Sequence, residues 1–231
     1  MRTAHFVLKT AAFQLAAVPT LVAALCIAAL SLPASAFAAT LTLKLTDQDG
    51  AAVDDAVIYI TTIDGRHQAS MPQTVDVDQV NEMFVPHVRA TTVGSLVNFP
   101  NSDHVRHHVY SFSEAKTFEV PLYSGVPAEP TLFDKAGLVT LGCNIHDHML
   151  GYILVLDTPW FAEVRGGSGA IRDLPAGELA IEIWHPRLAS GAAIQHTLTV
   201  GADETATLTE QVELRPERTV RRAPRRGSSR Y

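Results

Sequence analysis

Residues 142–151 are Gly142-Cys143-Asn144-Ile145-His146-Asp147-His148-Met149-Leu150-Gly151. In this stretch a thiol, an imidazole and a thioether follow one another at positions i, i+3 and i+6. A second group of histidines, His104, His107 and His108, lies about forty residues upstream. One cysteine, two histidines and a weakly bound methionine are the ligands of blue-copper electron-transfer sites. The pattern therefore predicts a copper site.

The segments on either side of this stretch have the pattern of β-strands. Residues 137–143 are expected to form a strand that ends at the cysteine, and residues 149–155 the strand that leads away. Similar short segments bounded by Gly, Pro and Asp recur along the chain, and no long segment has a helical period. Residues 83–88 are expected to form one strand, and residues 68–81 and 121–130 are expected to be loops. The prediction is an all-β protein built from antiparallel sandwiches.

The first 38 residues have the features of a secretory signal peptide. Arg2 and Lys9 precede an apolar run from Leu15 to Leu32, and the triplets Ala34-Ser35-Ala36 and Ala36-Phe37-Ala38 both fit the small-x-small pattern of a signal-peptidase site. We therefore expect export to the periplasm; the alternative is an N-terminal membrane anchor. No later apolar run is long enough to cross a membrane, so the mature protein is not expected to span one.

Cleavage of this leader would leave Cys143 as the only cysteine. The sequence contains two cysteines, and the other, Cys26, lies within the leader. A lone cysteine in an exported protein has no internal disulfide partner and is open to oxidation. Metal ligation explains its presence best; the alternative is a buried structural thiol.

Charge is distributed unevenly along the chain, whose net charge is −6. Residues 39–214 carry nine Lys and Arg against twenty-three Asp and Glu, a net charge of −14, whereas residues 215–231 carry seven Arg and one Glu, a net charge of +6. The acidic body suggests electrostatic steering of redox protein partners. The Arg-rich tail is expected to be disordered and able to contact an anionic surface. The alternative is that the acidic face only favours solubility and the tail is disordered without a partner. No nucleic-acid partner is expected.

The copper pattern resembles the cupredoxins, the superfamily of plastocyanin and amicyanin. The spacing Cys143-x2-His146-x2-Met149 is similar to the short ligand loop of amicyanin. Residues 84–86, 94–97 and 98–101 resemble the strands that lead to the first histidine ligand in that family. The resemblance covers roughly residues 80–157 and is greatest to plastocyanin-like proteins of the methylamine-utilisation type. It implies a Greek-key β-sandwich.

The resemblance implies His107 as the first histidine ligand. In the family an Asn precedes this histidine by a few residues, and a polar residue and Val follow it; Asn101 and the run His107-His108-Val109 fit. The implied copper ligands are His107, Cys143, His146 and Met149.

Two departures from the family concern the rigidity of the site. His108 stands where the family usually has Asn, and Asn144, Ile145 and Asp147 replace the usual loop prolines. His104, His108 and His148 are expected to be neighbours of the ligands or surface residues. A second metal ion stays open, but a dinuclear centre with two bridging cysteines is excluded.

The flanking segments resemble another small β-sandwich. Residues 45–57 and 169–184 are similar to the two halves of a carboxypeptidase regulatory-like module. This predicts that residues 40–62 pair with residues 166–214, with the cupredoxin segment, residues 80–157, inserted between them. The alternative is a tandem of residues 40–157 and 158–214. The segment Trp184-His185-Pro186 is expected to be structural.

The leading functional prediction is a periplasmic type 1 copper protein that carries single electrons and is not an enzyme. A copper oxidase or nitrite reductase needs a further copper site with three histidines, and too few histidines remain at recognisable spacing. The same ligands suit a periplasmic Cu(I) chaperone or storage protein. A third alternative is a scaffold or adhesion protein that binds no metal.

Overall fold

Every regular element of the described chain is a β-strand. The structure is a computed structural model, which describes residues 38–127 and 129–217. This range contains seventeen strands and no helix, so no helix of the described residues is long and apolar enough to cross a membrane. The all-β prediction is confirmed. The predicted leader up to residue 37 and the tail from residue 218 lie outside the described residues.

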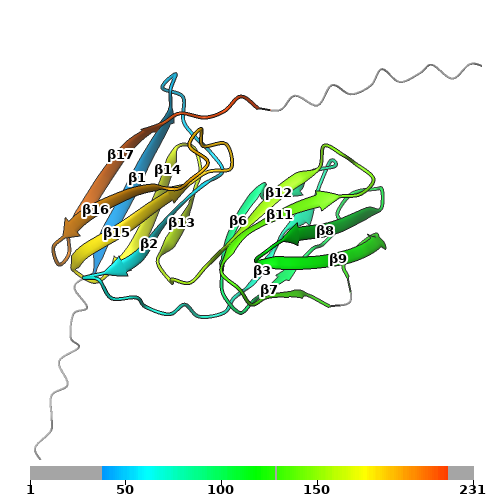
Figure 1. Ribbon diagram of the computed structural model, residues 1–231, viewed down its shortest axis with the longest axis horizontal. Helices are drawn as coiled ribbons and strands as arrows, with labels where there is room; N and C mark the ends of the chain where they lie inside the picture. Colours follow the sequence, from blue (N-terminus) through cyan, green and yellow to red (C-terminus); the bar gives the residue numbers. More distant parts are fainter. Residues whose placement is uncertain (1–37, 128, 218–231) are drawn as a thin grey trace, which may run out of the picture. The chain divides into compact units, whose positions relative to one another are not determined.

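Seven strands form two sheets around one core (Figure 1). One sheet has the order β14-β1-β17, and the other has the order β13-β2-β15-β16. Their bounds are β1 (Ala39–Asp47), β2 (Ala56–Ile63), β13 (Phe161–Val164), β14 (Ser168–Leu174), β15 (Gly177–Trp184), β16 (Ile194–Val200) and β17 (Thr205–Val212). Leu41 and Leu43 of one sheet and Ile58 and Ile60 of the other are fully buried in the same cluster. We call this part the flanking sandwich.

Strands from both ends of the chain share the flanking sandwich. β1 pairs antiparallel with β14 and parallel with β17, while β2 pairs antiparallel with β13 and β15. On this basis we propose that residues 40–62 and 166–214 form one module with residues 80–157 inserted between them. The short strand β13 lies before residue 166, the predicted start of the second half of this module. The sequence did not predict it, because four residues are too few to show a period.

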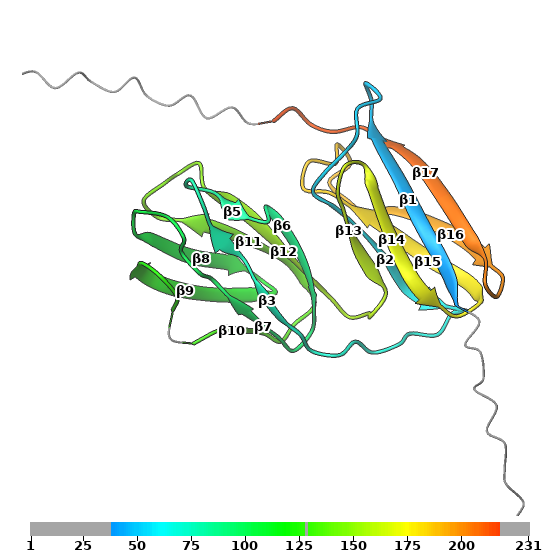
Figure 2. The same cartoon turned by 180° about the vertical axis from the view of Figure 1, so that it is seen from behind.

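The remaining ten strands surround a separate core. The largest sheet has the order β6-β12-β11-β8-β9, beside the sheets β10-β7-β3 and β4-β5 (Figure 2). Phe84, Phe99 and Phe133 are buried in this core, and full burial of one such side chain contributes about 1.5–3 kcal/mol. The bounds are β3 (Thr74–Asp76), β4 (Asp78–Gln79), β5 (Phe84–Val85), β6 (Val88–Thr92), β7 (Ser95–Asn98), β8 (His107–Ser113), β9 (Lys116–Tyr123), β10 (Thr131–Phe133), β11 (Gly137–Cys143) and β12 (Leu150–Leu156).

Two stretches differ from their sequence-based expectation. Residues 68–81, expected to be a loop, contain β3 and β4. Residues 83–88, expected to be one strand, are divided between β5 and β6 around the cis peptide bond Val85–Pro86. Strands of two or three residues have no detectable alternation, and β3 depends on its parallel pairing with β7, which is remote in sequence.

His185 gives the flanking sandwich a dependence on pH. The side chain is buried and accepts a hydrogen bond of 3.0 Å from the Arg187 amide. Burial, and then the positive charges of Arg187 and His87, lower the pKa of His185 to about 4. The unfolded chain binds a proton near its ordinary pKa of about 6.5, so stability is lost as the pH falls from about 6.5 to 4.

Replacing His185 by Gln is expected to remove this component, which amounts to about 3 kcal/mol. Urea unfolding at pH 7 and pH 4 gives the loss in the free energy of unfolding for each protein. The His185 component is the loss in wild type minus the loss in His185→Gln. The exposed His67, replaced by Gln, is the matched control and should retain the wild-type difference. An unchanged difference in His185→Gln would contradict the assignment.

Candidate metal centre

The alternation of two strands turns the first two donors inward. In β11 the side chains of Val139, Leu141 and Cys143 are buried, and in β8 those of His107 and Val109 are buried. Successive side chains of a strand point to opposite faces, so Cys143 and His107 continue the core faces of their strands. Cys143 is paired directly with Val109. His107, two residues along β8, is therefore a diagonal neighbour of the cysteine.

The loop between β11 and β12 supplies the other two predicted ligands. We call residues 143–149 the ligand loop. It leaves β11 at Cys143 and enters β12 at Leu150, which is paired with Gly142. The Met149 amide donates to the His146 carbonyl at 2.9 Å, which folds the loop back on itself. Met149 is buried in the same cluster as Cys143, whereas His146 is partly exposed.

Three donor atoms lie close together where β8, β11 and the loop between β11 and β12 meet. His107 Nδ1 lies 3.1 Å from His146 Nδ1. Cys143 Sγ lies 3.8 Å from His107 Nδ1 and 3.7 Å from His146 Nδ1. Within the described ranges, these residues form the one group of three or more such side chains whose donor atoms can share a metal ion.

This group fits a copper ion. A metal ion about 2.0 Å from each nitrogen and about 2.3 Å from the sulfur reaches all three donors, because no pair is farther apart than 3.8 Å. A soft thiolate combined with two imidazoles is a donor set that suits copper in both oxidation states. The side of the site formed by His107 and Cys143 is closed to solvent, since His107 is fully buried and Cys143 is 4% exposed.

Asp103 fixes the orientation of His107, a role that the sequence did not reveal. Its Oδ2 lies 2.7 Å from His107 Nε2, on the opposite side of the ring from Nδ1. A carboxylate bonded to one imidazole nitrogen leaves the other free for a metal and raises its basicity. Although burial raises the pKa of Asp103, the Glu82 amide, the His107 ring and the Asn81 amide together hold it below its usual range.

Asn101 holds the loop that carries Asp103. Its side-chain amide donates to the carbonyl oxygens of Val105 and Tyr123 at 3.0 and 3.1 Å, and its Oδ1 accepts from the Asp103 amide at 3.0 Å. Asp103 lies four residues before His107, but in a loop this spacing does not bring two side chains together. The contact therefore had no sequence signal.

The other histidines lie around this group. His108 points away from the core, with Nε2 3.0 Å from Glu119 Oε1. His148 Nε2 lies 3.3 Å from Glu82 Oε2, and its ring centre lies 6.1 Å from that of His146. His104 is exposed. Within the described part of the chain, none of the three belongs to the three-donor group.

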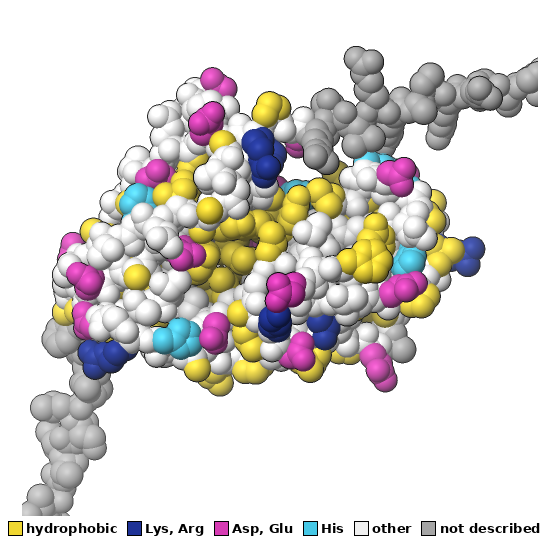
Figure 3. Space-filling model, viewed as in Figure 1, with side chains coloured by type: hydrophobic (Ala, Val, Ile, Leu, Met, Phe, Trp, Pro, Cys, Tyr) yellow, Lys and Arg dark blue, Asp and Glu magenta, His cyan; other side chains and the backbone are white. Residues whose placement is uncertain are grey.

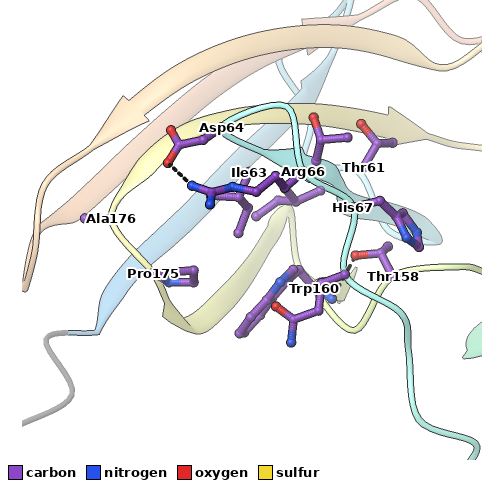
Figure 4. A pocket seen from close by; sticks show the side chains of 12 residues that line it. Thr61, Ile63, Asp64, Arg66, His67, Thr158, Trp160, Pro175 and Ala176 are labelled. Carbon is purple, nitrogen blue, oxygen red and sulfur yellow. Dashed lines mark hydrogen bonds and ion pairs between the residues drawn. The ribbon is translucent and has the colours of Figure 1, made fainter.

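A separate hollow of about 360 Å³ lies on the flanking sandwich (Figure 4). Arg66 lies over it and pairs with Asp64 at 3.6 Å. The indole nitrogen of Trp160, which lines it, is buried and has no hydrogen-bond partner among the described residues. The hollow shares no residue with the three-donor group.

Comparison with known proteins gives weak likenesses. No family model and no curated protein matches the sequence. A reduced amicyanin variant is 21% identical over 36% of this chain and 82% of its own, with a TM-score of 0.33. A purple cupredoxin from Nitrosopumilus maritimus is 20% identical over 36% and 98%, with a TM-score of 0.31. A copper-containing nitrite reductase from Thermus scotoductus is 25% identical over 42% and 25%, with a TM-score of 0.34.

Proposed function

We propose that this protein is a type 1 copper protein that carries single electrons between redox partners. The observation that carries the proposal is the triangle of His107 Nδ1, Cys143 Sγ and His146 Nδ1, with sides of 3.1 to 3.8 Å. The buried Met149 lies in the same cluster as Cys143, and its thioether would be the weakly bound fourth ligand. A bound copper ion would supply the one-electron redox couple.

The role of the protein is to hold these ligands in place. A thiolate and two imidazoles suit both Cu(I) and Cu(II), and a weakly bound thioether would favour Cu(I). Ligands that stay in place in both oxidation states keep the rearrangement on electron transfer small. The paired backbones of β8 and β11 and the hydrogen bond between His107 and the Asp103 carboxylate supply this constraint.

His146 is the proposed route for electrons. It is the partly exposed member of the four ligands, because His107, Cys143 and Met149 are each at most 4% exposed. Two apolar side chains close to it in the sequence are exposed: Ile145 to 50% and Leu150 to 41%. Exposed apolar side chains beside a ligand in the sequence suit transient contact with a partner.

Acidic side chains are proposed to steer the partner rather than to bind it at one point. On the face seen in Figure 3, Asp and Glu side chains are scattered over the surface. With a net charge of −14 for residues 39–214, such a surface attracts a positively charged partner from a distance.

We further propose that the chain belongs to the cupredoxins of the plastocyanin and amicyanin type, with methylamine utilisation as the implied process. In this proposal the mature protein lies in the periplasm after removal of residues 1–38, and the chain carries out no covalent chemistry.

Addition of Cu(II) to the purified metal-free protein tests the proposal. We expect an intense absorption near ~600 nm from the copper–thiolate bond, at one copper per chain, and reversible bleaching on reduction. A protein that binds copper without this band, or does not bind it, would contradict the proposal. Metal analysis of the protein as isolated is the companion measurement.

A Cu(I) chaperone or storage protein is the second candidate. The His148 ring, 6.1 Å from that of His146, supports it, because it offers a further imidazole beside the exposed ligand. Rapid transfer of Cu(I) to an acceptor protein without reversible redox cycling would favour this candidate over the first.

A further inference from the structure

The turn between β4 and β5 contacts both segments that carry the proposed ligands. Val80 and Met83 exchange backbone hydrogen bonds of 3.0 and 3.2 Å, which leaves Asn81 and Glu82 at the tip. Both tip residues have the left-handed backbone conformation, with φ angles of 55° and 58°. Residues other than glycine adopt this conformation at a cost, and it persists where the surroundings enforce it. We call residues 80–83 the β4–β5 turn.

Asp103 joins the β4–β5 turn to the first histidine. The carboxylate accepts hydrogen bonds from the Asn81 amide at 2.6 Å and from the Glu82 amide at 2.9 Å. The same carboxylate lies 2.7 Å from His107 Nε2. The left-handed tip therefore presents two adjacent N–H groups to the group that orients His107.

Glu82 joins the β4–β5 turn to the ligand loop. Its carboxylate lies 3.3 Å from Nε2 of His148, and the two side chains are 37% and 29% exposed. His148 stands between His146 and Met149 in the sequence. At the end of the same hairpin, Phe84 packs on Gly151, where an added Cβ would lie 2.9 Å from the Phe84 Cβ.

The ligand loop needs such support because no proline stiffens it and one internal backbone hydrogen bond, from Met149 to His146, holds only its last turn. It has no proline between Cys143 and Met149, so ring closure fixes none of its φ angles. Asn144, Ile145 and Asp147 are exposed and are not held by the core. Ordered ligand geometry must therefore be enforced partly from outside the loop.

We propose that the β4–β5 turn is an outer brace of the copper site and that Glu82 is a positioning residue. This inference rests on the proposed function. Through His148, Glu82 holds the loop that carries Cys143, His146 and Met149. Through Asp103 the same turn holds His107. One hairpin thus couples the two halves of the ligand set and takes the place of the loop prolines.

The test compares Glu82→Ala, His148→Ala and the double variant. The matched control is His196→Ala, because His196 pairs with Glu210 at 3.0 Å on the flanking sandwich with similar exposure, 28% and 22%. Three readouts apply: the rate of copper transfer from the Cu(I)-loaded protein to a chelator, the electron paramagnetic resonance spectrum of the Cu(II) form, and amide hydrogen exchange of residues 144–149 in the metal-free protein.

Each single variant is expected to release copper about two- to fivefold faster when His148 is protonated, the range for a partly exposed ion pair. It should also alter the Cu(II) spectrum and speed amide exchange in the loop. The double variant should match the single ones, since both break one contact, and the control should match wild type. Unchanged release and exchange in Glu82→Ala, or additive effects in the double variant, would overturn the brace. Absence of the ~600 nm band in wild type would instead refute the proposed function, while exchange in the metal-free protein still tests the brace.

Discussion

The Cys143→Ser variant is expected to lose the intense visible absorption completely. The band arises from charge transfer between a thiolate and Cu(II), and a serine hydroxyl is neither soft nor ionised near neutral pH. Copper affinity should fall as well, because two imidazoles remain from a three-donor group. Absorption after addition of Cu(II), together with bound copper per chain, measures both effects.

The fold should survive this substitution. Cys143 is 4% exposed, and a hydroxyl buried without a partner costs about 1–3 kcal/mol, which circular dichroism and urea unfolding will register. Ser111, also buried and on the neighbouring strand β8, provides the matched control as Ser111→Ala, which should keep the full band. A Cys143→Ser protein that remains blue would exclude the thiolate as ligand.

The Asp103→Asn variant is expected to bind copper about 10- to 100-fold more weakly, the usual effect of removing a carboxylate behind a metal-bound histidine. The amide cannot supply the negative charge that orients the His107 ring through Nε2. Competition with a chelator of known affinity measures the change. The control is Asp78→Asn, because the Asp78 carboxylate bonds Ser102 at 2.8 Å rather than a predicted ligand.

The same substitution should change the response to acid. The pKa of Asp103 is lowered in the folded protein, so this carboxylate stabilises the fold above its ordinary pKa of about 3.9. That stability is lost as the pH falls through the lower pKa of the folded state. Metal-free Asp103→Asn should therefore lose less stability than wild type below about pH 4, as measured by urea unfolding. An equal loss in both proteins, with unchanged copper affinity, would contradict the role of Asp103.

Much of the site was predictable because its chemistry is local. Cys143, His146 and Met149 lie within seven residues, and their side chains alone define a soft donor set. His107 was chosen from three nearby histidines by resemblance, and the structure places its Nδ1 within 3.8 Å of both other donors. Its role as a ligand stays a proposal.

Contacts between remote loops were not predictable. Asp103, Glu82 and His148 meet through turns that have no period, and the left-handed residues Asn81 and Glu82 carry no glycine signal. The short strands β3 and β4 were missed for a related reason, since their pairing partners determine them rather than their own sequence.

The sequence by itself determined the all-β class, because alternation and turn residues act over a few neighbours. It also determined which donor atoms the ligand loop offers. Only the tertiary structure brings His107 into contact with the loop. It alone decided which carboxylate orients that histidine and how the strands of residues 39–63 pair with those of residues 161–212. These depend on contacts between residues far apart in sequence, whose closure is fixed by the packing of the whole fold rather than by any local pattern.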